Sequence, residues 1–266
     1  MAQEKWLVSE AKTIDLDGVR SLKVALVGGQ IDIVAHDEPG VRVEVHSVTG
    51  KELRITLDGD RLELDHPQLG WENFIEVFRT FSGKAKAEVS VLVPRGIALK
   101  FGVVSASALV SGLTTDPTLS TVSGDLVIDG VRGNITVNTV SGEVSLRNHE
   151  GSVDVHTVSA DVTASGRISK FTSDSVSGDM FLDLVGTPDE IRSHSVSGDL
   201  TVRLEPGVPA QYRINTVSGV LQLDDAEIKG VRGSFTSRFG TLDQHWLELR
   251  ANSVSGDVSV LHAVNA

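Results

Sequence analysis

The sequence predicts an all-β protein whose main part is a parallel β-solenoid, and three observations indicate this fold class. The tripeptide Val-Ser-Gly, usually followed by an acidic residue, recurs over the last two thirds of the chain. Between its copies, apolar residues alternate with polar ones, as in strands. Hydrophobic residues make up 40% of the chain but aromatic residues only 5%, so the core must consist mainly of Val, Leu and Ile. A regular repeat of strand-like units is typical of solenoids.

The repeats are aligned by the glycine of this phrase, or by the alanine that replaces it, and they follow one another at intervals of 16 to 21 residues. The aligned positions are Ala106, Gly124, Gly142, Ala160, Gly178, Gly198, Gly219, Gly240 and Gly256. Glycine adopts a positive φ at little steric cost, so we expect it at tight corners between strands. The structural corners predicted in this way are Gly124, Gly142, Gly178, Gly198, Gly219 and Gly256.

Each repeat is expected to contain two short strands and a turn, as in "DLVID" (125–129) and "NITVN" (134–138) joined by "DGVRG". Val137 and Val140 are separated by an odd interval, so the inward-facing set changes phase near the corner. A third face of the coil would explain this change, and the pattern leaves a two-faced and a three-faced coil open. An antiparallel meander is the alternative topology.

The chain is expected to divide at about residue 95. Residues 1–95 form a strand-rich region in which Val27-Gly28-Gly29 resembles a degenerate first copy of the phrase, and residues 96–266 carry the solenoid repeats, in one continuous domain. The first region contains an aromatic insert at 70–83 whose aromatic residues are spaced 3, 4 and 3 apart, as on one face of a helix. These residues are Trp71, Phe74, Phe78 and Phe81. We expect the insert to cover one end of the solenoid; an exposed interface for a partner or a second copy, or a membrane-lying helix, are the alternatives.

Two columns of polar residues flank the repeated phrase. One column precedes it, with Asn138, His156, Asp174, His194, Asn215 and Asn252, and the other follows it, with Asp125, Glu143, Asp161, Asp179, Asp199 and Asp257. We expect both to be structural ladders of side chains. The alternative for the acidic column is a divalent-cation site, because hard cations prefer clustered oxygen ligands.

The net charge of −12 argues against binding to nucleic acid or to anionic lipid surfaces. The chain contains no Cys and none of the common catalytic or nucleotide-binding motifs, and its His residues are scattered. We therefore expect no enzyme, no metal and no cofactor. The first residues lack a secretory apolar region and no apolar run reaches the roughly 18 residues of a membrane span, so a cytoplasmic protein is expected.

The segments "VLVPRGIALKFGVVSASALVSGL" and "INTVSGVLQLDD", together with the recurring "TVSGDL", resemble the DUF4097 family. This is a family of bacterial β-strand repeat proteins, labelled candidate adhesins, within the wider toast-rack group. The resemblance implies a β-solenoid-like fold and no established catalytic residues, so no site residue is carried over from it.

The function expected from these observations is that of a non-catalytic scaffold that presents a rigid solenoid to a protein partner or to a second copy. The last segment, "NSVSGDVSVLHAVNA" (252–266), stops just after a complete repeat, which predicts an uncapped end suited to end-to-end dimerisation. One alternative is a carbohydrate-binding or carbohydrate-active solenoid with a groove near Phe235, Phe239 and Trp246. The cation-binding acidic column is the second alternative.

Overall fold

The computed structural model describes residues 3–66, 85–229 and 232–264. The aromatic residues Trp71, Phe74, Phe78 and Phe81 lie outside these ranges, so their predicted roles stay predictions. All regular elements of the described residues are β-strands, and this part of the chain contains no helix long and apolar enough to cross a membrane. The chain forms two compact units, residues 1–133 and 134–266. The division between a strand-rich region and the repeats, expected near residue 95, stays a prediction.

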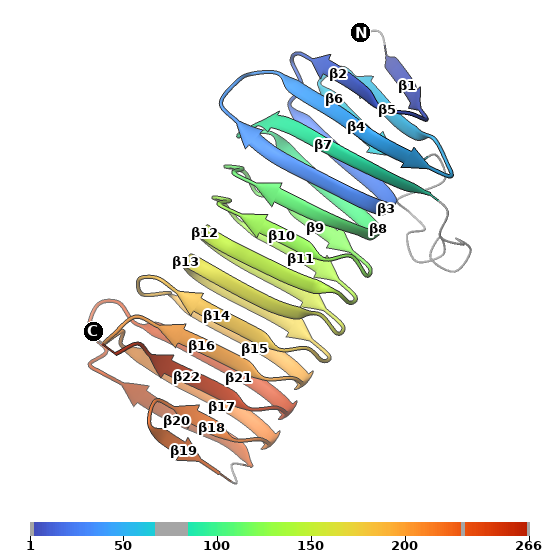
Figure 1. The fold of residues 1–266 in the computed structure, drawn as a ribbon. Helices are drawn as coiled ribbons and strands as arrows, with labels where there is room; N and C mark the ends of the chain where they lie inside the picture. The colour runs from blue at the N-terminus through green and yellow to red at the C-terminus, as the bar shows by residue number, and fades with distance from the viewer. Residues whose placement is uncertain (1–2, 67–84, 230–231, 265–266) are drawn as a thin grey trace. The chain divides into compact units, whose positions relative to one another are not determined.

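The described residues of the N-terminal unit form ten strands, which are labelled in Figure 1. They are β1 (Glu4–Val8), β2 (Lys12–Leu16), β3 (Ser21–His36), β4 (Val41–Thr49), β5 (Leu53–Asp58), β6 (Arg61–Asp65), β7 (Lys86–Pro94), β8 (Ala98–Ser111), β9 (Thr118–Thr121) and β10 (Leu126–Asp129).

These strands form two sheets that share the long strands β3 and β8, because each of the two bends at a corner and continues in the other sheet. The sheet before the corner has the order β1-β5-β6-β3-β8-β9, and the sheet after it has the order β2-β4-β7-β3-β8-β10. From β6 and β7 inward the strands are parallel, while β1, β2, β4 and β5 pair antiparallel. Gly29 lies opposite Ala106, so the degenerate first copy of the phrase occupies a corner in register with the next.

In the C-terminal unit, the part of the chain that the structure describes forms twelve strands. They are β11 (Ile135–Thr139), β12 (Glu143–Thr157), β13 (Asp161–Ser175), β14 (Met180–Leu184), β15 (Glu190–Ser197), β16 (Leu200–Leu204), β17 (Ala210–Ser218), β18 (Leu221–Leu223), β19 (Ala226–Ile228), β20 (Gly233–Phe239), β21 (Leu247–Ser255) and β22 (Val258–His262).

Each coil of this unit contributes one strand to a sheet before the corner and one to a sheet after it. The coil therefore has two faces, which answers the question that the sequence left open. Successive coils pair in parallel and in register, so the antiparallel meander is wrong for the repeats. Aliphatic side chains such as Leu182, Ile191 and Val202 are fully buried between the two sheets. Their burial removes apolar surface from water and is the main source of stability.

The last repeat does not lie at the end of the stack. Strand β21 lies between β15 and β17, and β22 lies between β16 and β18. The outer coil is instead formed by β17 and β18, and the antiparallel strands β20 and β19 cover its edge. The prediction of an uncapped C-terminal coil was wrong, because the chain skips one position, builds and covers the outer coil, and then returns to fill the gap.

A buried histidine directly follows β6. His66 is fully buried, and its Nδ1 accepts a hydrogen bond of 3.2 Å from the backbone N–H of Val27. The neighbouring Asp65 is also buried and pairs with Arg54. Burial disfavours the charged imidazolium and lowers the pKa of His66 to about 4.

We predict that His66 makes the stability depend on pH. Its pKa is lower in the folded chain than the usual value of 6.5, so as pH falls from about 6.5 to about 4 the unfolded chain binds a proton that the folded chain does not. The free energy of unfolding should fall by on the order of 2 kcal/mol over this window. Urea denaturation at a series of pH values should show this fall for the natural chain and a smaller one for His66→Gln. Parallel profiles of the two proteins would contradict the assignment.

A second prediction concerns the close approach of successive corners. Gly178 has a φ of 115°, and a Cβ built on it would overlap the backbone carbonyl of Ala160 in the preceding coil. Gly207 has a φ of 73° but open space around its Cβ position, so it tests the effect of backbone conformation alone. Gly178→Val should lower the free energy of unfolding by about 3 kcal/mol or more, and Gly207→Val by about 1–2 kcal/mol. Equal losses in urea denaturation would show that close packing of the coils is not what requires glycine.

Candidate functional site

Four of the five positions of the phrase Thr/Ser-Val-Ser-Gly-Asp hold the coil together. The first residue closes the corner: the backbone N–H of Gly124 donates to Thr121 Oγ1 at 3.0 Å, and that of Ala160 donates to Thr157 Oγ1 at 3.0 Å. The third residue joins neighbouring coils, since Ser159 Oγ donates to the carbonyl of Val140 at 3.1 Å. Both roles are local side-chain bonds to backbone groups that the corner leaves without strand partners.

The glycine position brings successive corners into backbone contact. A Cβ on Gly124, Gly178, Gly198, Gly219 or Gly256 would overlap the backbone of the adjacent coil. A positive φ is found at Gly142, Gly178, Gly198 and Gly256 but not at Gly124 or Gly219, where the close approach alone requires glycine. The alignment of Gly240 with these corners was wrong, because this residue follows the covering strand β20.

The acidic position bonds the next coil through its carboxylate. Asp161 accepts the N–H of Asp179 at 2.9 Å, Asp179 that of Asp199 at 2.8 Å, and Asp199 that of Asp257 at 2.7 Å. Asp257 in turn accepts the N–H of Val220. We call Glu143, Asp161, Asp179, Asp199 and Asp257 the acid ladder; all five are exposed. Among the described residues no group of three His, Cys, Asp or Glu side chains is placed to hold a metal ion.

The valine of the phrase has no comparable structural role in the C-terminal unit. Its side chains point outward at each corner and are between 44% and 61% exposed. In the order of the stacked coils they are Val140, Val158, Val176, Val196, Val254 and Val217. We call this set the valine column. Because neighbouring strands are about 4.8 Å apart, it forms a continuous apolar row along one edge of the unit.

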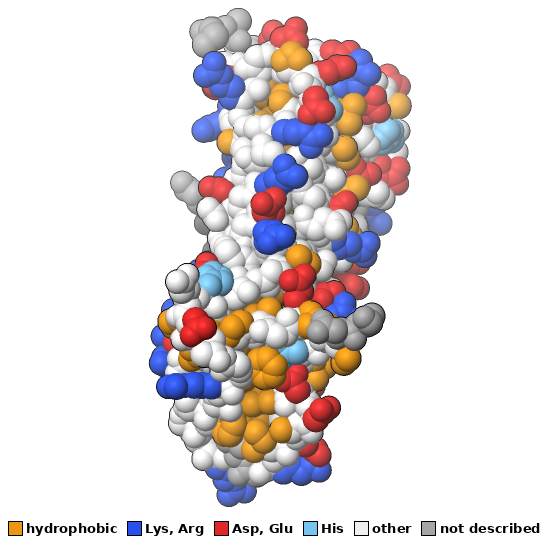
Figure 2. All heavy atoms as spheres, turned by 90° about the vertical axis from the view of Figure 1, so that its left-hand side faces the viewer, with side chains coloured by type: hydrophobic (Ala, Val, Ile, Leu, Met, Phe, Trp, Pro, Cys, Tyr) orange, Lys and Arg blue, Asp and Glu red, His pale blue; other side chains and the backbone are white. Residues whose placement is uncertain are grey.

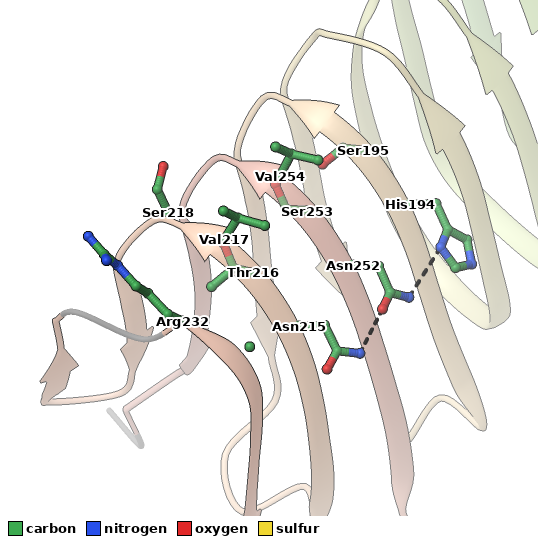
Figure 3. Close-up of a pocket in the computed structure, with 11 residues that line it drawn as sticks. His194, Ser195, Asn215, Thr216, Val217, Ser218, Arg232, Asn252, Ser253 and Val254 are labelled. Carbon is green, nitrogen blue, oxygen red and sulfur yellow. Dashed lines mark hydrogen bonds between the residues drawn. The ribbon is translucent and has the colours of Figure 1, made fainter.

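The valine column has the acid ladder on one side. On the other side lies the polar column predicted from the sequence, which we call the polar ladder. Its last members are joined by hydrogen bonds from Asn215 to Asn252 at 2.7 Å and from Asn252 to His194 Nδ1 at 3.1 Å, as Figure 3 shows. His156 lies 3.3 Å from Asp174 in the same ladder. The two predicted columns are therefore present, and the valine column lies between them.

A hollow of about 600 Å³ lies at the end of the valine column (Figure 3). Its apolar part is lined by Val217 and Val254, and its rim carries Arg232, which immediately precedes β20. The buried hydroxyls of Thr216 and Ser253 also line it and make no hydrogen bond within the described part of the chain. The regular corner bonds are thus missing where the hollow lies.

The corresponding edge of the N-terminal unit is covered. Val27 and Val104 occupy the same position of the phrase, but both are buried in a cluster with Ala25 and Ala85. Val122 is partly buried against this cluster. The same position therefore has two environments in one chain, covered in the first unit and exposed in the second.

The histidines do not form a recognisable catalytic site in the described residues. His46 Nε2 lies 2.8 Å from Ser90 Oγ, but this pair is exposed, and no carboxylate bonds the second ring nitrogen within the described chain. His262 bonds Asp224 and the carbonyl of Val208 through its two ring nitrogens and stacks on Phe239. A serine–histidine pair without an orienting acid lacks the third part of a hydrolase triad.

The aromatic residues expected to form a carbohydrate groove do not line the hollow. Phe235 and Phe239 lie on β20, with Phe239 stacked on His262, and Trp246 is 37% exposed just before β21. The face seen in Figure 2 has its largest gathering of hydrophobic side chains in the lower part of the view, with acidic and basic side chains spread over the whole face. No described cleft contains an aromatic platform on which a sugar ring could stack.

Sequence reasoning missed the valine column because it assigned the aliphatic residues to the interior. The odd interval between Val137, which is buried, and Val140, which is exposed, was the available signal. It marks the residue at which the chain turns the corner and the side chain points outward. Arg232 could not be associated with the column, because only the pairing of β20 with β17 brings it there.

The model of the Toastrack DUF4097 family matches residues 19–261. The chain belongs to this family. Among solved structures, a candidate adhesin from Bacteroides fragilis is 12% identical, with a TM-score of 0.49 over 95% of this chain and 97% of that one. A candidate cell adhesion protein from Clostridium sporogenes is also 12% identical, with a TM-score of 0.31 over 98% and 99% of the two chains. No curated protein matches this Toastrack chain.

The hydrogen bonds of the acid ladder predict a stability effect that is independent of cations. Asp199→Ala leaves the N–H of Asp257 without its acceptor and should lower the free energy of unfolding by about 1 kcal/mol. Thermal denaturation should show the same loss in calcium and in a chelator. Asp225→Ala, at an exposed turn residue, is the matched control and should have little effect. A loss for Asp199→Ala that appears only in calcium would instead indicate a cation site.

Proposed function

We propose that this Toastrack chain is a non-catalytic scaffold whose C-terminal unit binds a protein surface, either of a partner or of a second copy, through the valine column. The observation that carries the proposal is the exposure of one apolar residue in every coil, at the one position of the phrase that has no structural role. An unbroken exposed apolar row is typical of an interaction site rather than of a free surface.

The burial of Val27 and Val104 in the N-terminal unit supports this function. Where the chain supplies a cover, the valines of the phrase lie in a small apolar cluster with Ala25 and Ala85. The exposed valines of the second unit offer the same type of surface to another protein. The hydroxyl and amide groups beside them can bond the polar rim of such a partner.

The family model names no activity. The carbohydrate alternative has no aromatic platform in its favour, and the acid ladder uses its carboxylates to bond backbone N–H groups. The cytoplasmic location stays a prediction.

The proposal is tested by comparing three immobilised forms of the chain as baits in native lysate. Val196→Ser/Val254→Ser removes two apolar side chains from the middle of the column, and Val185→Ser removes an equally exposed valine from a turn outside it. Proteins that bind the column should be retained by the natural chain and by Val185→Ser, and retained at least about fivefold less by the double variant. Each such protein should then bind the purified natural chain directly.

Because all three valines are exposed, the variants should unfold at the same temperature as the natural chain, which a thermal melt checks. Identical sets of captured proteins on all three baits, with no difference in capture of a second copy, would refute the valine column as the binding surface.

A further inference from the structure

We propose that the C-terminal unit forms a homodimer in which two valine columns pack against each other, with the two-fold axis parallel to the column. This inference rests on the proposed function and identifies a second copy of the chain as the occupant of the surface. It replaces end-to-end association, which the covered outer coil does not favour.

The valine column is complementary to itself. Its spacing is fixed by the hydrogen bonds between coils, so a second column has the same period and each of its valines can meet the equivalent valine of the first. The column is regular, since consecutive corners are in register from β12 through β13, β15 and β21 to β17. No rearrangement of the backbone is needed for two such rows to meet, valine against equivalent valine.

Two copies could pack with their columns running in the same direction or in opposite directions, and the charges beside the column favour the first. The acid ladder runs along one side of the valine column and the polar ladder, which contains His156 and His194, along the other. An axis parallel to the column places the acid ladder of each copy opposite the polar ladder of the other. An axis perpendicular to the column, with the copies running in opposite directions, places acid ladder against acid ladder. Repulsion between two such rows of carboxylates opposes the second arrangement.

The hollow lies at the outer end of this interface. The pairing of β20 with β17 places Arg232 beyond Val217, beside Ser218 on the rim, where it makes no ion pair with any described residue (Figure 3). An axis parallel to the column keeps each residue at its own height, so the two hollows of the dimer lie at the same end, beside the two copies of Val217.

The size of this surface sets the expected affinity. Six half-exposed valines and the adjacent hydroxyl groups from each copy approach the lower limit of roughly 1,000 Å² for a specific interface. We therefore expect a reversible dimer with a Kd on the order of 10 µM. Six apolar side chains from each copy are enough for a weak, reversible complex of this kind.

Sedimentation equilibrium at 0.15 M salt tests association. The natural chain and Val185→Ser should dimerise with the same Kd, and Val196→Ser/Val254→Ser should weaken the dimer by about tenfold or more. A natural chain that remains monomeric at several hundred micromolar, roughly ten times the expected Kd or more, would overturn the proposal.

Cysteine cross-linking tests the orientation, because the chain contains no Cys of its own. Val140→Cys and Val217→Cys lie at opposite ends of the valine column. In the parallel dimer each variant should form a disulfide-linked dimer with itself under mild oxidation, since equal positions face each other. In the opposite orientation only a mixture of the two variants would cross-link, and that result would overturn the parallel arrangement. Val185→Cys is the control and should stay monomeric.

These results separate the dimer from the broader function. If the natural chain is monomeric but Val196→Ser/Val254→Ser loses a captured partner, the homodimer is refuted and the scaffold proposal stands. If the chain dimerises and the double variant dimerises equally well, the valine column is not the interface of that dimer. If neither dimerisation nor partner capture depends on the column, both proposals fail.

Discussion

The close contact between the backbones of successive corners is the constraint on which the rest of this structure depends. Parallel strands can stack in register through many coils only if each corner adds the same rise as the strands, so the corners must approach one another as closely as the strands do. Glycine permits that approach, and Gly178, Gly198 and Gly256 lie in sequence against the backbone of the preceding coil. Threonine and serine hydroxyls then satisfy the backbone groups at the corner, and aspartate carboxylates bond the N–H of the next coil. These positions of the repeated phrase therefore serve to stack each corner on the one before it.

The same constraint explains why the valine is exposed. The residues before the corner alternate between the interior and the solvent, and the chain must change sheets within the phrase. A buried Thr157, an outward Val158 and a buried Ala160 are the positions that result in one coil. Nothing in the corner's hydrogen bonds requires a valine at the outward position, where a polar side chain would fit as well. Its use in every coil of the C-terminal unit therefore has to be explained by what the surface contacts.

Much of this architecture could be predicted from the sequence, because it depends on residues that are close together in the chain. The period of the phrase, the glycine corners and the two polar columns are local patterns, and the structure contains all of them. The order of the coils is different in kind. Each copy of the phrase can pair with any other, so similarity among repeats does not tell which coils are neighbours. The bonds from Asp257 to Asp199 and from Asn252 to His194 join residues 58 positions apart, and the repeat interval alone gives no sign of them.

The displaced last coil has a consequence for how the unit becomes stable. Strands β15 and β17 are close in sequence, yet β21 separates them, so the outer coil cannot bury its inner side until residues 247–262 have entered the gap. In a simple solenoid each coil can add to the one before it, and stability grows from one end. Here the last three coils must assemble together, because the middle one of the three arrives last. The loop that must close before these contacts form is long, which makes this step slow compared with the pairing of adjacent repeats. The arrangement gives the unit an end in which the strand order is fixed by long-range contacts, and it places Val196, Val254 and Val217 on three coils that form or separate as one.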